Sequence, residues 1–167
     1  MSGPITVPWR TRVAVVVGDP VPRGRTLQAA TYVARELVGR EPDLVVDLVD
    51  LEADLVAEVC AAELVVFGSP TDDGVHTRLL QAFLDRFPSD ALAGLAVPLM
   101  TGPGPGHALA PDVALRPALS AIARIEPAKG LYIAESSCDD PAAYAWWLDL
   151  ARPVISACLG SGMGISA

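Results

Sequence analysis

The residues best placed to bind a ligand occupy a turn between an apolar run and an amphipathic stretch. The apolar run is Val13–Val17, and the amphipathic stretch begins at Thr26. A strand that ends in a glycine-containing turn and opens a helix directs backbone N–H groups and the positive helix end at one point, where an anion binds. Two arginines and a hydroxyl add to that attraction. The residues predicted to bind there are Gly18, Arg23, Gly24, Arg25 and Thr26.

Asp19 opposes anion binding in this turn. A carboxylate within ~4–6 Å of a phosphate repels it unless a counter-charge or a proton intervenes. Two hypotheses follow. In the first, Asp19 turns away, to cap the helix or to pair with an arginine, and the turn binds a phosphate. In the second, the turn no longer binds a phosphate.

Two neighbouring carboxylates and two histidines are the other candidates for chemistry. Asp72 and Asp73 precede Gly74, and His76 and His107 are the chain's two histidines. The carboxylates could act as a base, bind a metal with His76, or accept from an amine-bearing ligand. Alternatively, they form a solvent-exposed Asp-Asp-Gly turn, with His107 shaping a loop and His76 capping a helix.

The sequence has no signature of nucleophilic catalysis, zinc or dinucleotide binding. Ser69 stands in Gly-Ser-Pro rather than in a nucleophile elbow, and the three cysteines lack C-x-x-C spacing. Gly102-x-Gly104-x-Gly106 departs from the Rossmann fingerprint and contains two prolines. We therefore assign no catalytic residue, and we expect Cys60, Cys138 and Cys158 to be inert packing residues.

These candidates need a scaffold, and the alternation of strand and helix patterns supplies one. Short apolar runs rich in β-branched residues predict five strands, and the stretches between them predict five helices. The strands are predicted at 13–17, 44–49, 64–67, 96–101 and 131–134, and the helices at 26–38, 53–61, 77–87, 109–123 and 141–157.

This pattern predicts an α/β fold: a doubly wound, five-stranded parallel sheet of flavodoxin-like type with strand order 2-1-3-4-5. Ligands bind such sheets beyond the strand C-termini, where loops 18–26, 68–76 and 101–107 converge. We expect one domain over residues 12–158, an N-terminal extension over 1–11 and a flexible tail over 159–167. The aromatic cluster Tyr144, Trp146 and Trp147 fits either core packing or a subunit contact.

The composition narrows the class of partner and the location. A net charge of −8 with 12 basic residues disfavours nucleic acid binding. No apolar run reaches the ~18–20 residues of a membrane span, and the first residues lack the apolar core of a signal peptide. We expect a cytoplasmic protein that binds neither nucleic acid nor membrane.

Two segments of the chain look like motifs of a known family. Residues 98–119 begin Pro98-Leu99-Met100-Thr101-Gly102 and lead through His107 into a helix that contains Ala114-Leu115-Arg116-Pro117, and residues 69–88 begin Ser69-Pro70 and lead into the next helix. The first segment looks like the Thr-Gly-Gly loop and following helix, and the second like the Thr-Pro-Val-Tyr loop and helix, of the NAD(P)H-dependent FMN reductases of flavodoxin-like fold. The chain resembles this family, most of all its alkanesulfonate-utilisation type, from about Val13 to Ser136. The resemblance adds the following residues to the flavin-binding set: Ser69, Pro70, Thr71, Asp72, Asp73, Thr101, Gly102, Gly104 and His107.

The departures from the family's pattern fall on the ligand loops. The family's phosphate turn reads Gly-Ser-Pro-Arg-x-x-Ser-Arg-Ser, and here Asp19, Val21 and Gly24 replace two serines and an arginine. Pro103 and Pro105 replace residues whose N–H groups can serve the flavin ring. Asp72 and Asp73 stand where the family has an aromatic residue and often a cation, and Val113 replaces a helix tyrosine.

The resemblance implies an NAD(P)H:FMN oxidoreductase, with NAD(P)H as co-substrate, that supplies reduced flavin to a partner flavin-dependent monooxygenase. Hydride would pass from the nicotinamide to flavin N5, and the protein would assemble as a homodimer or homotetramer. The departures imply an alternative: a degenerate relative that has lost FMN. It would serve as a binding or scaffold subunit, or use an acidic pocket made by Asp19, Asp72 and Asp73.

Overall fold

A parallel β-sheet forms the centre of the molecule. The computed structural model describes residues 11–125 and 128–161. Neighbouring strands in the sheet pair in the order β2-β1-β3-β4-β5, as predicted for a flavodoxin-like fold, and β6 pairs with β4. The strands are β1 (Val13–Val17), β2 (Leu44–Asp47), β3 (Leu64–Pro70), β4 (Leu92–Gly102), β5 (Ala123–Ile125) and β6 (Leu131–Ala134).

Two short strands share the fifth position of the sheet. β5 pairs with β4 at Leu92 and Leu95, whereas β6 pairs with the end of β4, from Leu99 to Gly102. Leu95 and Leu99 also pair with β3, so both short strands lie along the opposite edge of β4. The predicted fifth strand is therefore β6, and β5 is an addition that its three-residue length hid from the sequence pattern.

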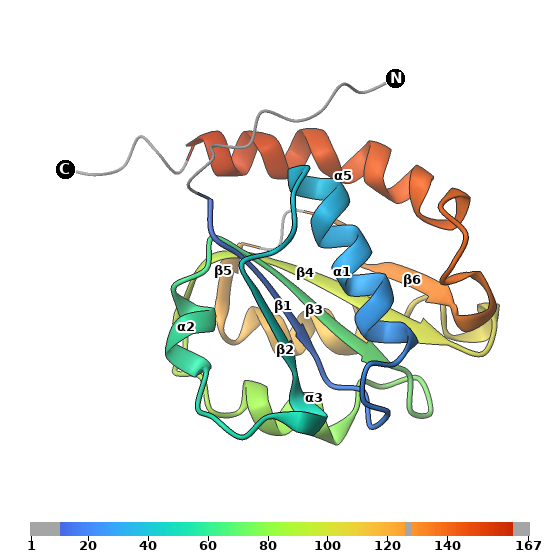
Figure 1. The fold of residues 1–167 in the computed structure, drawn as a ribbon, viewed down its shortest axis with the longest axis horizontal. Coiled ribbons are helices and arrows are strands. Elements are labelled where there is room, and N and C mark those ends of the chain that lie inside the picture. The colour runs from blue at the N-terminus through green and yellow to red at the C-terminus, as the bar shows by residue number, and fades with distance from the viewer. Residues whose placement is uncertain (1–10, 126–127, 162–167) are drawn as a thin grey trace.

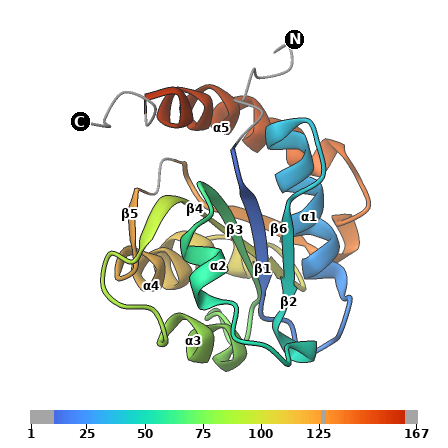
Figure 2. The same cartoon turned by 60° about the vertical axis from the view of Figure 1, so that its left-hand side comes forward.

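Helices cover both faces of the sheet (Figure 1). On one face, α1 (Arg25–Val38) and α5 (Ala142–Ser161) pack on the core formed by Val13, Val15 and Val17. On the other face lie α2 (Val56–Cys60), α3 (Arg78–Leu84) and α4 (Arg116–Ser120), the last preceded by a π-helical segment at Pro111–Leu115. The view in Figure 2 shows the two layers on either side of the sheet.

Several element boundaries differ from the sequence prediction. β4 begins at Leu92 rather than Ala96, because its early residues are mainly alanine, glycine and leucine, which carry little strand preference. The helix predicted over 109–123 divides into the π-helical segment and α4, and its end becomes β5. α2 and α3 are shorter than predicted, and Phe87 remains buried beyond the end of α3.

The aromatic cluster of α5 divides between core and surface. Tyr144 and Trp147 are buried in the core, whereas Trp146 is 48% exposed. α5 continues to Ser161, three residues past the expected domain boundary. Residues 1–10 and 162–167, most of the expected extension and tail, lie outside the described residues. Within residues 11–125 and 128–161, no helix has the length and hydropathy required to cross a membrane.

Candidate functional site

The loops that follow β1, β3 and β4 lie at the same end of the sheet and are hydrogen-bonded to one another (Figure 1). The Gly18 N–H donates to the Gly68 carbonyl at 2.9 Å, and the Thr71 N–H donates to the Thr101 carbonyl at 2.7 Å. The Thr77 hydroxyl donates to the Gly18 carbonyl at 2.5 Å. The predicted convergence of the three loops is therefore present, and backbone contacts fix it.

In the loop after β1, the carboxylate of Asp19 lies inside the turn. Asp19 is 7% exposed, and its Oδ1 accepts a hydrogen bond from the Val21 N–H at 2.9 Å. A Cβ on Gly24 would lie 2.5 Å from Asp19 Oδ2, so only a glycine leaves room for this oxygen. Gly24 is the N-cap of α1 and provides no side chain to the helix start. The carboxylate therefore stands against the first turn of α1.

The two arginines of this turn are directed elsewhere. The Arg25 guanidinium donates to the Glu135 carbonyl at 2.6 Å, beyond the end of β6. Arg23 has a positive φ of 50°, and its N–H donates to Asp47 Oδ2 at 2.8 Å. Within the described residues, no basic side chain forms an ion pair with Asp19. Neither of the two ways in which Asp19 was expected to leave the turn is observed.

Three of the predicted binding hydroxyls hold the loops together. Thr26 and Thr101 are each 1% exposed, and their hydroxyls form a 2.8 Å hydrogen bond between α1 and β4. The fully buried Ser69 hydroxyl donates to the Pro70 carbonyl at 2.8 Å and accepts from the Thr77 N–H at 2.9 Å. These side chains position the loops and have little hydrogen-bonding capacity left for a ligand.

The loop after β3 contains a tight two-residue turn. Asp72 and Val75 exchange backbone hydrogen bonds of 2.7 and 3.0 Å, and the central residues Asp73 and Gly74 have φ values of 50° and 82°. Two positive φ values are the mark of a type I′ turn, which favours the sequence Asp-Gly. Both carboxylates are exposed, so the turn interpretation is the one that the geometry supports.

A cavity of about 620 Å³ lies between this turn and the loop after β4. His107 is among its lining residues, and the Nδ1 atom of His107 is buried without a hydrogen-bond partner among the described residues. The buried Oγ1 of Thr71, at the start of the turn's loop, likewise lacks a partner. The other lining residues are Asp73, Gly74, Pro105, Gly106, Ala108, Leu109, Ala110 and Val113.

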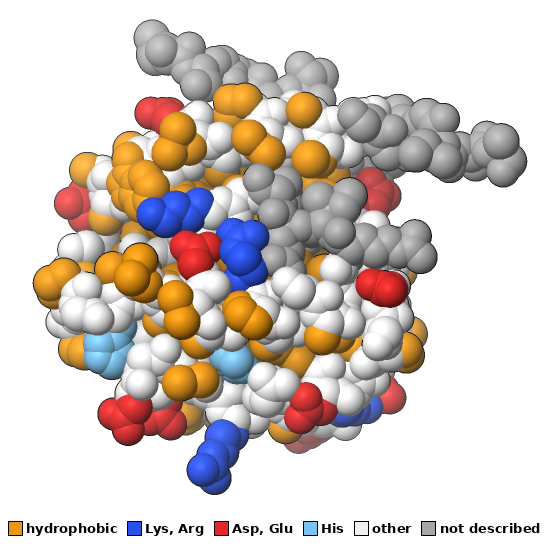
Figure 3. Space-filling model, turned by 180° about the vertical axis from the view of Figure 1, so that it is seen from behind, with side chains coloured by type: hydrophobic (Ala, Val, Ile, Leu, Met, Phe, Trp, Pro, Cys, Tyr) orange, Lys and Arg blue, Asp and Glu red, His pale blue; other side chains and the backbone are white. Residues whose placement is uncertain are grey.

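The surface around the cavity is mainly apolar. Leu109, Val113 and Val75 are 66%, 69% and 49% exposed. Figure 3 shows histidine side chains on one face of the molecule, with apolar and uncharged groups around them and acidic side chains close by at the lower edge. The cavity therefore combines apolar side chains with a carboxylate and an imidazole, a lining that can accommodate a small organic ligand.

Tyr132, on β6, contacts the loop after β4. Its hydroxyl donates a hydrogen bond to the carbonyl of Gly104, one of the predicted site residues. Burial raises the pKa of Tyr132, so the phenol keeps its proton at neutral pH and remains a donor. Gly102 and Gly104 therefore belong to a loop whose conformation β6 helps to fix.

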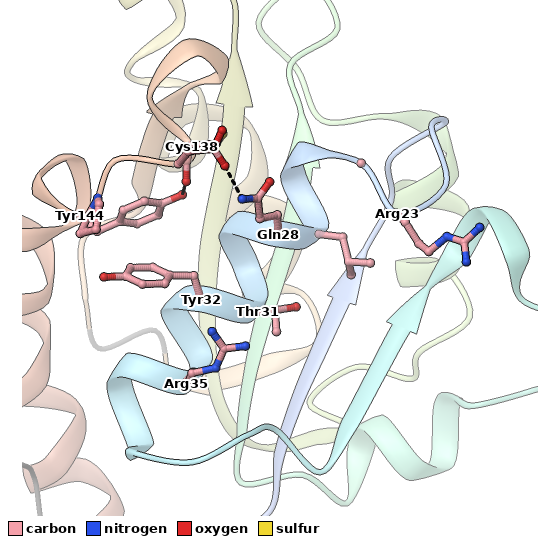
Figure 4. Close-up of a pocket in the computed structure, with 11 residues that line it drawn as sticks. Arg23, Gln28, Thr31, Tyr32, Arg35, Cys138 and Tyr144 are labelled. Atoms are coloured by element: carbon pink, nitrogen blue, oxygen red, sulfur yellow. Dashed lines mark hydrogen bonds between the residues drawn. The ribbon is translucent and has the colours of Figure 1, made fainter.

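A second cavity of about 380 Å³ lies beside α1, away from the cavity between the loops (Figure 4). Arg23 and Gly24 line it together with Gln28, which donates a hydrogen bond to Asp139. Its far wall is formed by Tyr32 and Tyr144, whose rings lie 4.7 Å apart. Two residues predicted to bind phosphate thus face the outer side of α1.

Sequence reasoning did not identify Asp47 and Tyr132 as part of the site. Asp47 is the last residue of β2, which pairs with β1, so its place at a strand end could have pointed to the site. No pattern in the sequence pointed to Tyr132. The metal and acidic-pocket hypotheses receive no support. No group of three metal-ligating side chains occurs in the described part of the chain, and Asp19 is not among the residues that line the cavity containing Asp73.

The phosphate of FMN does not fit the turn after β1 in this conformation. An anion there would meet the Asp19 carboxylate, and the N–H groups of Val21 and Arg23 already donate to carboxylates of the chain. The half of the site between the loops after β3 and β4 is separate from this conflict, because Asp19 is not among the apolar and polar residues that line its cavity.

The fold is shared with solved flavoproteins. An NADH:FMN oxidoreductase in its apo form has a TM-score of 0.74 and 22% identity, over 90% of this chain and 89% of that one. RosB, with bound 8-demethyl-8-formylriboflavin-5'-phosphate, has a TM-score of 0.68 and 15% identity over 92% and 81%. Flavodoxin 1 from Bacillus cereus has a TM-score of 0.58 and 16% identity over 92% and 99%. At these identities the likeness concerns the fold.

A match between the sequence and a family model identifies the family, although no curated protein sequence matches the chain. The family model described as NADPH-dependent FMN reductase matches residues 11–137, which include all three loops of the site and more than half of the chain. This protein therefore belongs to the NADPH-dependent FMN reductase family.

Proposed function

We propose that this protein is an NAD(P)H-dependent flavin reductase that supplies reduced flavin to a partner monooxygenase. The observation that carries the proposal is the cavity between the loops after β3 and β4, in a chain that belongs to the FMN reductase family. Similar folds are found in an NADH:FMN oxidoreductase and in RosB, whose bound intermediate is a flavin phosphate.

The chain's part in this reaction is to bind and orient. Flavin and nicotinamide supply the redox chemistry when both are present, and the protein does not need a general acid or base. Leu109 and Val113 offer apolar surface to a ring, and Asp73 and His107 line the same cavity. Of the residues predicted to bind flavin, we assign Asp73 and His107 to the ring.

We also propose that the protein is a homodimer or homotetramer. Val75, Leu109 and Val113 leave apolar surface exposed around the cavity. A second copy covering this surface would remove it from water and exclude solvent from a bound ring. The cytoplasmic location and the monooxygenase partner stay predictions.

The test is flavin-dependent oxidation of NADH and NADPH, followed at 340 nm, with FMN and riboflavin each as acceptor. We expect oxidation that requires flavin. Ala108→Trp places an indole in the cavity lining and should lower kcat/KM by about tenfold or more, equal to about 1.4 kcal/mol. Ala145→Trp, the same change on the exposed face of α5, is the matched control and should leave the rate unchanged.

A second function, that of a binding or scaffold protein without flavin, is favoured by the position of Asp19 alone. The same experiment separates the two. Absence of flavin-dependent oxidation with either flavin and either nucleotide would contradict the reductase and leave the scaffold function. Equal loss of rate in both tryptophan variants would contradict the assignment of the cavity.

A further inference from the structure

The turn after β1 contains a carboxylate of the chain itself, that of Asp19. Asp19 is 7% exposed, its Oδ1 accepts from the Val21 N–H, and its Oδ2 occupies the space where Gly24 has no side chain. A carboxylate against the first turn of a helix is stabilised by the helix dipole, as a bound phosphate would be. The positive end of α1, which would attract a phosphate, is therefore already compensated by a carboxylate of the chain.

A second carboxylate strengthens this effect. Asp47 Oδ2 accepts from the Arg23 N–H at 2.8 Å, and Asp47 Oδ1 is buried without a partner among the described residues. The Arg25 guanidinium, which could have offset these charges, donates to the Glu135 carbonyl. The turn therefore presents carboxylate acceptors, and the Arg25 guanidinium donates to a carbonyl rather than to them.

The chemistry of these acceptors distinguishes between flavins. A phosphate dianion offers only acceptors and negative charge, so it conflicts with Asp19 and Asp47. A sugar-alcohol chain that ends in a hydroxyl offers O–H donors and no charge, and a hydrogen bond to a carboxylate is among the stronger ones. The net charge of −8 acts in the same direction, because it disfavours an anionic ligand and is indifferent to a neutral one.

We propose, on the basis of the flavin reductase function proposed above, that this turn selects a flavin without phosphate, riboflavin, over FMN. Asp19 is the specificity-determining residue and accepts a hydrogen bond from the end of the ribityl chain. Gly24 is its necessary companion, because a Cβ there would displace the carboxylate.

The experiment is an equilibrium titration of riboflavin and of FMN with the protein, followed by flavin fluorescence in the absence of nicotinamide. We expect the unaltered chain to bind riboflavin about tenfold or more tightly than FMN, a difference of about 1.4 kcal/mol. Asp19→Asn removes the charge and keeps the size, so it should improve FMN binding and bring the ratio of the two dissociation constants to one or below. Asp149→Asn, on the exposed surface of α5, is the matched control and should leave the ratio unchanged.

Salt dependence gives a second measurement that needs no variant. Raising the ionic strength shortens the Debye length from about 30 Å at 0.01 M to about 8 Å at 0.15 M, which screens repulsion of FMN but leaves neutral riboflavin unaffected. The preference for riboflavin should therefore shrink as salt is added.

The outcomes are distinguishable. If the unaltered chain binds FMN as tightly as riboflavin or more tightly, the inference is overturned and the reductase function stands. If it binds neither flavin, both fail. If Asp19→Asn folds and leaves the preference for riboflavin intact, Asp19 is not the selecting residue. If that variant does not fold, the ratio of the two dissociation constants in the unaltered chain decides, and a ratio of one overturns the inference.

Discussion

The hydroxyls of Thr26 and Thr101 form a hydrogen bond that solvent does not reach, and they come from residues 75 positions apart in the chain. Each hydroxyl satisfies the other, so the pair costs little to bury. The bond joins the start of α1 to the end of β4, which are the two elements that carry the first and third loops of the site. These residues therefore contribute to the site by fixing its walls.

Removing both members of this pair should cost less than the sum of the costs of removing each one. Thr26→Val and Thr101→Val keep the shape and leave one buried hydroxyl unpaired, so each should lower the free energy of unfolding by about 1–3 kcal/mol. The double variant should lose less than the sum of the two. Urea unfolding followed by circular dichroism measures all three. Thr31→Val, on the same helix and partly exposed, is the control and should change stability by less than about 0.5 kcal/mol. Strict additivity of the two substitutions would contradict the pairing.

At the scale of elements, α3 packs directly against the turn after β1. The Thr77 hydroxyl is the N-cap of α3, accepting from the Leu80 N–H at 3.2 Å while it donates to the Gly18 carbonyl. A Cβ on Gly18 would lie 2.7 Å from the Leu80 backbone nitrogen and 2.6 Å from its Cβ. The helix start and the strand end are therefore held at a distance that only glycine permits.

This contact predicts a large effect of a single methyl group. Gly18→Ala forces backbone against backbone and should lower the free energy of unfolding by about 1–3 kcal/mol, as other overpacked sites do. Gly104→Ala is the control, since its Cβ would meet nothing within 4 Å and its backbone is extended. Chemical unfolding of the two variants side by side gives the comparison. Equal stabilities would show that α3 can move away from the turn without cost.

At the scale of the whole molecule, tyrosine burial links stability to alkaline pH. The chain has three tyrosines, and burial is the first cause that raises the pKa of Tyr32, Tyr132 and Tyr144. Tyr144 is buried in the core between α1 and α5, and its hydroxyl donates to the Cys138 carbonyl at 2.8 Å. The folded protein therefore keeps these protons at a pH where the unfolded chain has released them.

The sign of the pH dependence follows from that difference. Below the unfolded pKa of about 10 the contribution of the tyrosines to stability is complete, and it is lost as pH rises from about 10 toward the raised folded values. We expect the free energy of unfolding to fall between about pH 9.5 and 11, measured by urea unfolding at several pH values. Tyr144→Phe, compared with the unaltered chain, should show a smaller fall. An identical fall in both proteins would mean that Tyr144 does not contribute.

The sequence by itself determined the parallel sheet, the order of its five predicted strands and the end of the sheet at which three loops converge. The apolar runs at Val13–Val17 and Leu131–Ala134 predicted β1 and β6 to the residue, because buried parallel strands need continuous apolar sequence. The alternation of strands with helices then left few topologies, and these place the loops after β1, β3 and β4 at one end of the sheet. The family's motifs located the same loops.

Only the tertiary structure decided what the side chains in those loops do. Asp19 was recognised as a conflict, but its position against Gly24 depends on the path of the whole turn. The Arg25 guanidinium donates to the Glu135 carbonyl, and the Asp47 carboxylate accepts from the Arg23 backbone N–H, partners 110 and 24 residues apart. Local periodicity reports which face of an element is buried, whereas hydrogen-bond partners across loops are set by backbone positions that only the assembled sheet fixes.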